Sequence, residues 1–210
     1  MTPNSARRDF LGRLAALGAA VGLLPTHTAA AATASADTAI VAIEDPWMKR
    51  VTGTHKVVFH SHMPTEGLAL RWAQTYLDTQ KTTYGIWEKD CTVIVGLNGR
   101  SIGWFFNDAL WAKYPSIGDV MGMPSARSPM KEAIATLTSR RVILLACANS
   151  IRASGGRFLP TELRADRERT TAFGDEARAN LLPGVEVVPA MIVTLQQAQE
   201  RGCRYVYAGG

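Results

Sequence analysis

Cys147 is the residue whose type and position most directly predict chemistry in this chain. It follows the apolar run at positions 142–146, and Asn149 or Ser150 can cap a helix that begins directly after it. A sulfur atom there would lie near free backbone N–H groups and the positive end of a helix, which favours the nucleophilic thiolate. The pattern therefore predicts a reactive thiol. A cysteine that serves as a small buried apolar residue is the alternative.

Two histidines, His60 and His62, follow the first β-rich run of the sequence. Residues two apart on a regular strand point to one face, so with Cys147 they could form a copper or zinc site. No second Cys or His pair completes such a set. We therefore expect His60 to line the substrate crevice and assist proton movement, His62 to be solvated, and neither a metal nor a cofactor to be bound.

Cys91 and Cys203 each open a predicted strand, which places them near the opposite sheet edge from Cys147. They could form a disulfide only on closely neighbouring strands, because bridged Cα atoms lie within about 7 Å. We expect buried free thiols instead. Three cysteines leave at least one unpaired, and an unpaired thiol in an oxidising compartment needs burial or a role.

Composition and missing signatures exclude several classes of protein. The 210 residues are 47% hydrophobic and 20% charged, which excludes disorder, collagen-like repeats and a small disulfide scaffold. The net charge of +5 falls to +3 beyond the first 36 residues, too little to indicate nucleic-acid binding. Paired carboxylates and a Ser/His/Asp triad have no recognisable signature, and Gly96-Leu97-Asn98-Gly99 is too short to indicate a nucleotide site.

The elements that must position these residues alternate between strand and helix. Five β-rich runs are predicted, several of them continuously apolar, as in parallel strands covered on both faces; they lie at 57–59, 93–95, 142–146, 185–188 and 205–207. Helical spacing marks residues 65–80, and a second stripe of Ile192, Leu195 and Ala198 ends at Gly202. This order predicts an α/β fold, a three-layer α/β/α sandwich around a mostly parallel five-stranded, Rossmann-like sheet, with ligands at the carboxyl ends of the strands.

Two segments depart from the alternation. Residues 114–129 are rich in Pro, Gly and Met without a periodic face, which is typical of a lid or binding loop or of a solvated excursion. Residues 161–180 mix both signs of charge, which favours a solvated helical insertion, with a docking surface as the alternative.

The first residues predict export. Arg7-Arg8, then Phe10-Leu11 and a weakly apolar run at 14–24, resemble a twin-arginine signal peptide. About 11 apolar residues cannot cross a bilayer that needs about 20. Cleavage after Ala36, or equally after Ala32, would leave a periplasmic protein that meets the membrane only during export. We expect a signal peptide at 1–36, an arm at 37–54 whose Trp47 packs on the body, and a domain at 55–210.

Four stretches resemble the DsrE/DsrF-like sulfur-relay family, over about residues 55–208; they read HKVVF at 55–59, ILLACANSI at 143–151, LPGVEVVP at 182–189 and AQERGCRY at 198–205. The resemblance implies a single Rossmann-like domain, frequently a homo-oligomer, whose cysteine at position 147 carries a persulfide in sulfur-transferring members. It implies a small sulfur compound or a sulfur-carrying protein as partner. Only Cys147 maps onto a catalytic position. Relay members are largely cytoplasmic, so the leader and the Asp45-Pro46-Trp47 arm look like an exported branch.

The leading hypothesis is a periplasmic sulfur carrier or transferase. Cys147 would accept the sulfur, with Asn149, Ser150 and His60 in the substrate-binding site. A non-catalytic module that binds a small ligand or an oligomeric partner, with 114–129 as a lid over the same crevice, is the main rival. A metal chaperone or sensor using His60, His62 and Cys147 is the third reading, and a hydrolase is disfavoured because no nucleophile and base are paired.

Overall fold

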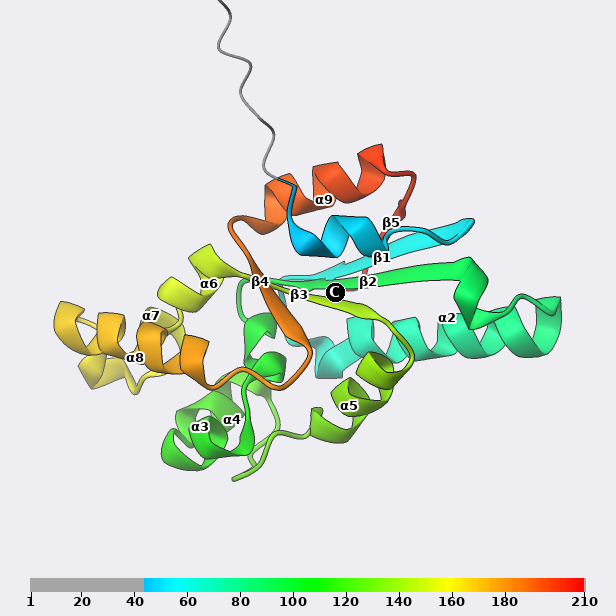
Figure 1. Ribbon diagram of the computed structural model, residues 1–210. Helices are drawn as coiled ribbons and strands as arrows, with labels where there is room; N and C mark the ends of the chain where they lie inside the picture. Colours follow the sequence, from blue (N-terminus) through cyan, green and yellow to red (C-terminus); the bar gives the residue numbers. More distant parts are fainter. Residues whose placement is uncertain (1–43, 210) are drawn as a thin grey trace, which may run out of the picture. The chain divides into compact units, whose positions relative to one another are not determined.

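Five short strands form one parallel sheet in the computed structural model, which describes residues 44–209 (Figure 1). The strands are β1 (His55–Ser61), β2 (Cys91–Leu97), β3 (Ile143–Cys147), β4 (Val185–Val188) and β5 (Arg204–Tyr207), in the spatial order β4-β3-β2-β1-β5. Each neighbouring pair is parallel. The predicted α/β fold with a five-stranded sheet is confirmed.

Helices cover both faces of the sheet. On one face lie α2 (Leu68–Tyr84) and α5 (Lys131–Ser139), and on the other lie α9 (Met191–Glu200) and the 3-10 turn η2 (Pro46–Arg50) (Figure 1). The shorter elements are α3 (Asp108–Lys113), α4 (Ser116–Met121), α6 (Ala148–Arg152), α7 (Gly155–Phe158), α8 (Arg167–Ala179) and the 3-10 turns η3 (Thr65–Gly67), η4 (Glu88–Asp90), η5 (Ser101–Phe105) and η6 (Thr161–Leu163). The elements thus form the three layers that the sequence predicts.

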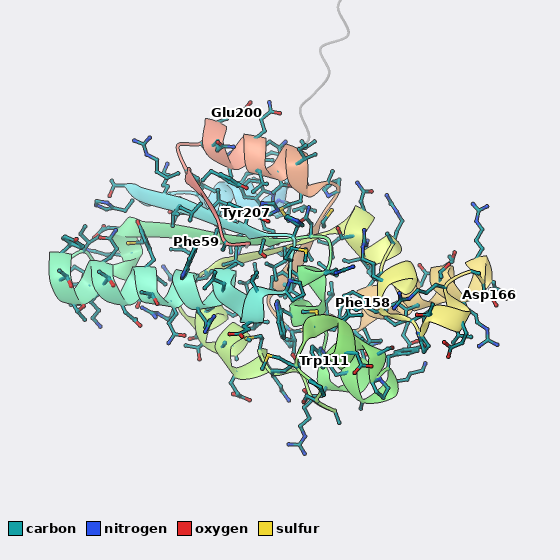
Figure 2. The ribbon with its side chains drawn as sticks, turned by 180° about the vertical axis from the view of Figure 1, so that it is seen from behind. Phe59, Trp111, Phe158, Asp166, Glu200 and Tyr207 are labelled. Atoms are coloured by element: carbon teal, nitrogen blue, oxygen red, sulfur yellow. The ribbon has the colours of Figure 1, made fainter. Side chains whose placement is uncertain are left out.

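Alternation along each strand divides the core into two clusters. Val57 and Phe59 point to the α2 face, whereas Val58 points to the α9 face. Figure 2 shows Trp111 and Phe158 among the helices on the α2 side, with Glu200 on α9 across the sheet. Because both faces are covered, the strands read as continuous apolar runs rather than as alternating ones.

The buried face of α9 differs from the predicted stripe. Met191, Thr194 and Ala198 are buried, whereas Ile192 is 80% exposed. The predicted stripe differs from the buried one because the buried face of α9 contains a threonine, Thr194. Its hydroxyl donates to the Ala190 carbonyl at 3.1 Å, so this polar group is hydrogen-bonded inside the core. The predicted end at Gly202 is confirmed: its φ is 86°, and the Cys203 N–H donates to the Ala198 carbonyl at 3.0 Å.

The first long helix begins and ends later than predicted. Residues 65–67 form η3, with Thr65 and Glu66 at positive φ, so α2 itself begins at Leu68. It continues past position 80 and ends at Gly85, whose φ of 66° is readily adopted by glycine.

The two irregular segments are both anchored to the core. Within 114–129, Ile117 and Met121 of α4 are buried, and a Cβ placed on Gly103 would lie 2.6 Å from the Met121 sulfur. This segment is therefore not a free lid, because two of its apolar side chains hold it in place. Within 161–180, α8 forms the predicted helical insertion and buries Phe173 and Ala177.

The arm packs on the body as predicted, within the described residues. Trp47 is 1% exposed and Met48 is 5% exposed, and both belong to the cluster on the α9 face. The predictions for residues 1–36 and 37–43 lie outside the described residues. Over positions 44–209, no helix has the length and hydropathy that a membrane span needs.

Candidate functional site

Cys147 is the last residue of β3 and the N-cap of α6. The helix that the sequence predicts at this point is present, but its cap differs from the prediction. Because strand passes into helix with no intervening loop, Asn149 and Ser150 occupy the second and third helical positions and neither caps the helix.

The carboxyl ends of β3 and β4 form a topological switch point. Cys147 is in register with Val188, and the connections leave these two ends toward opposite faces. Ile151 of α6 and Phe158 of α7 join the cluster on the α2 face, whereas α9 follows β4 onto the other face. In open α/β sheets, ligands gather where neighbouring strands diverge in this way.

The Cys147 sulfur is hydrogen-bonded at the start of α9. The Met191 N–H donates to Sγ over a donor–acceptor distance of 3.5 Å, whereas no N–H group of α6 is hydrogen-bonded to this sulfur, although Cys147 is the N-cap residue of that helix. One helix start therefore presents a backbone N–H group to this sulfur.

The same sulfur is covered. Cys147 is 4% exposed and belongs to the apolar cluster that contains Val188 and Met191. The Met191 side chain reaches over the neighbouring strand, where a Cβ on Gly96 would lie 2.6 Å from its sulfur. Met191 therefore packs in the same cluster as Cys147, with its side chain over the adjacent strand β2.

Asn149 and Ser150 lie near Cys147 in sequence but hold other partners. Asn149 is exposed and accepts a hydrogen bond from the Arg152 guanidinium. Ser150 is 7% exposed, and its Oγ accepts from the Gly99 N–H at 2.9 Å, which ties α6 to the loop after β2. Among the described residues, neither side chain is hydrogen-bonded to Cys147.

His60 is separated from Cys147 by strand β2. It is 8% exposed on β1 and in register with Gly96, which in turn pairs with Leu145 of β3. Its Nε2–H donates to Asn98 Oδ1 at 3.0 Å, and its Nδ1 accepts from the Tyr205 hydroxyl at 3.0 Å. Burial lowers the pKa of the His60 imidazole; the Asn98 bond opposes this effect, and the nearby His62 adds to it. The ring is therefore neutral near pH 7.

The second histidine packs on strand β5. The His62 and Tyr207 rings are stacked with centroids 5.5 Å apart, and the Tyr207 hydroxyl lies 2.7 Å from His62 Nδ1. Over residues 44–209, no group of three or more His, Cys, Asp or Glu side chains is placed to hold a metal ion. The metal site of His60, His62 and Cys147 is therefore not assembled.

Lowering the pH should reduce the free energy of unfolding through protonation of His60, and His60→Gln should remove this contribution to the pH dependence. Because the folded-state pKa lies below the ordinary value of 6.5, the unfolded chain binds the proton first as the pH falls. Stability is then lost below pH 6.5, until the folded ring also protonates. Unfolding titrations in urea from about pH 7.5 to about pH 5 measure this slope. An equal slope in the variant would show that His60 is not its source.

Cys91 and Cys203 are free thiols on opposite faces of the sheet. Cys91 packs against the cluster on the α2 face and Cys203 lies in the cluster on the α9 face. Strand β1 separates β2 from β5, so the condition for a disulfide, closely neighbouring strands, is not met. Burial raises the pKa of both thiols; Cys203 is buried as predicted, whereas Cys91 is only partly so.

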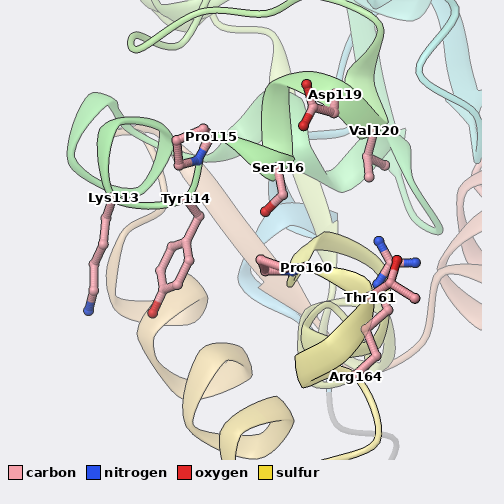
Figure 3. A pocket seen from close by; sticks show the side chains of 9 residues that line it. All are labelled: Lys113, Tyr114, Pro115, Ser116, Asp119, Val120, Pro160, Thr161 and Arg164. Carbon is pink, nitrogen blue, oxygen red and sulfur yellow. The ribbon is translucent and has the colours of Figure 1, made fainter.

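Several pockets lie over the described residues, and one of about 570 Å³ is formed by both irregular segments (Figure 3). It is lined by Lys113, Tyr114, Pro115, Ser116, Asp119, Val120, Pro160, Thr161 and Arg164. Cys147 does not line it. The segment at 114–129 thus forms a wall of a separate pocket rather than a lid over Cys147.

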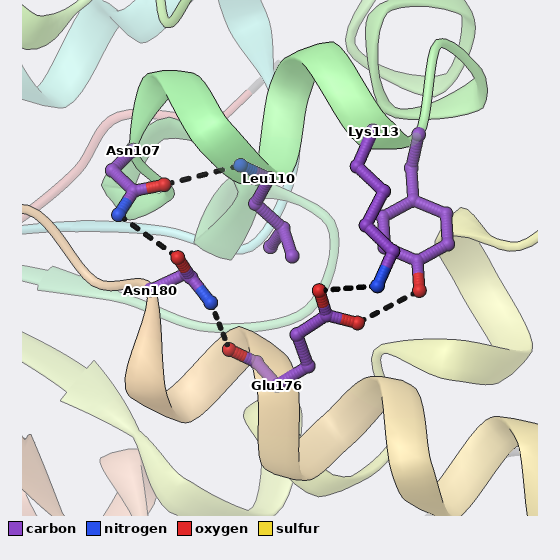
Figure 4. A network of polar contacts seen from close by, with 6 residues as sticks. Asn107, Leu110, Lys113, Glu176 and Asn180 are labelled. Carbon is purple, nitrogen blue, oxygen red and sulfur yellow. Dashed lines mark hydrogen bonds and ion pairs between the residues drawn. The ribbon is translucent and has the colours of Figure 1, made fainter.

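This pocket is backed by a polar network that joins α3 to α8 (Figure 4). The Lys113 ammonium donates to Glu176 Oε1 at 2.7 Å, and the Tyr114 hydroxyl donates to Oε2 at 2.8 Å. Burial alone would raise the pKa of the Glu176 carboxyl, but these two bonds outweigh it and lower that pKa. Asn107 caps α3 and donates to Asn180 Oδ1 at 3.1 Å, which fixes the same two helices at a second point.

Neither a protein-family model nor a curated protein matches this chain. Among solved structures, it is similar to MTH1491, a protein of unknown function from Methanobacterium thermoautotrophicum. The two share 18% sequence identity over 73% of this chain and 98% of that one, with a TM-score of 0.45. A likeness at this level carries no argument about function.

Sequence reasoning missed Tyr205, Tyr207 and Met191 as neighbours of the predicted site residues. Tyr205 and Tyr207 are two apart on a strand, so their spacing alone could have indicated a shared face next to the histidines. For Met191 the sequence holds no comparable signal, because its position over Gly96 depends on how α9 crosses the sheet.

Proposed function

We propose that this protein is an exported sulfur carrier or sulfurtransferase that holds a persulfide on Cys147. The observation that carries the proposal is the place of this thiol at the switch point, on the N-cap residue of α6 and hydrogen-bonded by the first N–H group of α9. Its support from sequence is the resemblance to the DsrE/DsrF-like family around Cys147 and the twin-arginine pattern at Arg7-Arg8, which makes the periplasm the proposed compartment.

The reaction needs no oxidant if the donor already carries sulfane sulfur. With thiosulfate, the Cys147 thiolate attacks the outer sulfur atom and forms the new S–S bond. The bond between the two sulfur atoms of thiosulfate breaks, and its electron pair leaves with sulfite. The product is a persulfide anion on Cys147, and N–H groups such as that of Met191 lie where they can stabilise its charge.

Because Cys147 is buried, donor access requires local movement, and in this proposal Met191 is the side chain that moves. Met191 is unbranched and has three rotatable bonds, so its thioether can leave the space over Gly96 at low cost. His60 is not placed to deprotonate Cys147 directly, because β2 separates the two. In this proposal His60 supports the substrate crevice from the side of β1.

Incubating the full chain with thiosulfate should add one sulfur atom to Cys147, detected by intact and peptide mass spectrometry. Cys147→Ala should abolish the adduct. Cys203→Ala is the matched control, because Cys203 is also 4% exposed in the same cluster, and this variant should keep the adduct. Absence of an adduct on Cys147, or equal labelling of Cys203, would overturn the proposal.

A second candidate function is favoured by the burial of Cys147, which is 4% exposed. In that reading the protein is a non-catalytic module that binds a small ligand or a second copy of itself, and Cys147 is a core residue. Cys147→Ala would then leave binding intact and no sulfur adduct would form on the unchanged chain. The thiosulfate experiment therefore separates the two candidates.

A further inference from the structure

A basic pocket lies at the amino ends of β2 and β3. Figure 1 shows these strand ends at the edge of the sheet opposite to α6. Its volume is about 440 Å³, within the range of small-molecule sites. Three separate parts of the chain form it: the arm, the entry to β2, and the end of α5. The lining residues are Lys49, Arg50, Thr52, Glu88, Lys89, Cys91, Thr92, Thr138 and Arg141.

The residues that line this pocket carry a net positive charge. Its one lining carboxylate, Glu88, is held by the Arg140 guanidinium at 2.7 Å. Arg50 pairs with Glu186. Lys49, Lys89 and Arg141 make no ion pair with any residue in the described range 44–209. Three cations that form no ion pair within this range therefore line this pocket, together with threonine hydroxyls. The carboxylates of Asp90 and Glu88 also lie nearby and, after burial, contribute to raising the pKa of the Cys91 thiol.

The arm wall of the pocket is fixed in place. The Gly53 N–H donates to Thr92 Oγ1 at 2.9 Å, and a Cβ on Gly53 would lie 2.6 Å from the Cys91 carbonyl carbon. Backbone therefore packs directly on backbone at the start of β2, and the buried Trp47 holds the same arm against the sheet. A pocket with such walls is formed before a ligand arrives.

Arg141 occupies a backbone position where other helices of this chain use glycine. Its φ is 63°, and the Val142 N–H behind it donates to the Leu137 carbonyl at 3.0 Å, closing α5 in the same way that α9 closes at Gly202. Helices α2 and α4 also end at left-handed glycines, Gly85 and Gly122. An arginine in this conformation is strained, whereas a glycine would not be, so the strain at Arg141 is an observation that a role for its side chain would explain.

We infer that this pocket binds a small dianion with a tetrahedral oxyanion head group, such as a phosphate monoester or a sulfate-type sulfur oxyanion. Lys49, Lys89 and Arg141 supply the charge, and the threonine hydroxyls supply hydrogen bonds. The volume of about 440 Å³ fits a small molecule of this class. The inference does not depend on Cys147, which lies at the other edge of the sheet.

Cys91 supplies a built-in reporter for the test. It lines the pocket and is partly exposed, whereas Cys147 and Cys203 are buried. A bound anion should shield Cys91 from a neutral alkylating reagent such as iodoacetamide, with the rate followed by peptide mass spectrometry. At ten times the Kd, about nine in ten pockets are filled, so the rate should fall about tenfold.

The probes are inorganic phosphate, glycerol phosphate and sulfate, each against sodium chloride of equal ionic strength. Protection by the phosphates alone would identify a phosphoester pocket, and protection by sulfate as well would identify a general tetrahedral-dianion pocket. Both outcomes support the inference. Equal protection by chloride, or no protection by any of the three, would overturn it.

Variants distinguish anion binding in this pocket from a general effect of the protein's charge. Lys89→Ala and Arg141→Gly should lose the protection, whereas Arg178→Ala should keep it, because Arg178 is exposed on α8 and removes the same charge elsewhere. Arg141→Gly also relieves the positive φ, so its melting temperature should equal or exceed that of the unchanged chain. Retained protection in both pocket variants would contradict the assignment.

Discussion

Replacing Trp47 by alanine should cost about 3–5 kcal/mol of unfolding free energy, the usual penalty for removing a buried aromatic side chain. Trp47 is 1% exposed, although it lies on a short arm that precedes the first strand. It packs in the cluster that also holds Val58 of β1 and Ile94 of β2. Since domains of this kind unfold with about 5–15 kcal/mol, the loss would be a large share of total stability.

Trp87→Ala is the matched control for this measurement. Trp87 is 61% exposed, and the Lys81 ammonium lies 5.8 Å from its ring centroid. An exposed cation–π contact is worth about 0.5–1 kcal/mol, so the loss should stay within that range. Urea unfolding at equilibrium measures both variants. Equal losses for the two would show that the arm is not part of the cooperative folding unit.

The arm also supplies two charged residues that line the basic pocket. The turn that buries Trp47 presents Lys49 and Arg50 to the basic pocket, so packing of the arm and formation of that pocket are one event. Trp47→Ala should therefore weaken anion protection of Cys91 as well as the fold. Trp47 and Lys49 lie two positions apart in the sequence, but the fold is needed to bring this arm to the start of β2, next to Lys89 and Arg141.

Strands were predictable because burial on both faces leaves a strong local signal. Residues 93–95 and 142–146 are apolar without interruption, and these runs are too short for a typical buried helix, which favours strands. The face of α9 was not predictable from the same rule. Thr194 is polar by type, yet its hydroxyl is satisfied by the helix backbone, so the buried stripe is invisible to a count of apolar residues.

For the candidate site, the sequence predicted which residues lie at the end of each strand, but not which strand ends are neighbours. Position and residue type placed Cys147 and His60 correctly at carboxyl ends of strands. Which ends are neighbours depends on the order of strands in the sheet, and there β2 separates β1 from β3. Segment 114–129 was misjudged for a related reason, because Ile117 and Met121 are too few to show a period although both are buried.

Met191→Ala should both destabilise the protein and expose Cys147. Met191 is 1% exposed, its side chain lies over Gly96, and its N–H donates to the Cys147 sulfur. Truncating a buried methionine costs about 2–5 kcal/mol because a cavity remains. If this side chain is the gate to the sulfur, Cys147 should react with iodoacetamide faster than in the unchanged chain.

Ile192→Ala is the control, since it changes the next residue of the same helix, which is 80% exposed. It should change the unfolding free energy by no more than about 0.5 kcal/mol and leave Cys147 unreactive. Cys203 in the same samples reports general unfolding, because it is as buried as Cys147 and lies in the same cluster. Faster alkylation of Cys147 with Cys203 unchanged identifies a local gate. If both thiols react faster together, the whole domain has loosened and Met191 does not gate the sulfur.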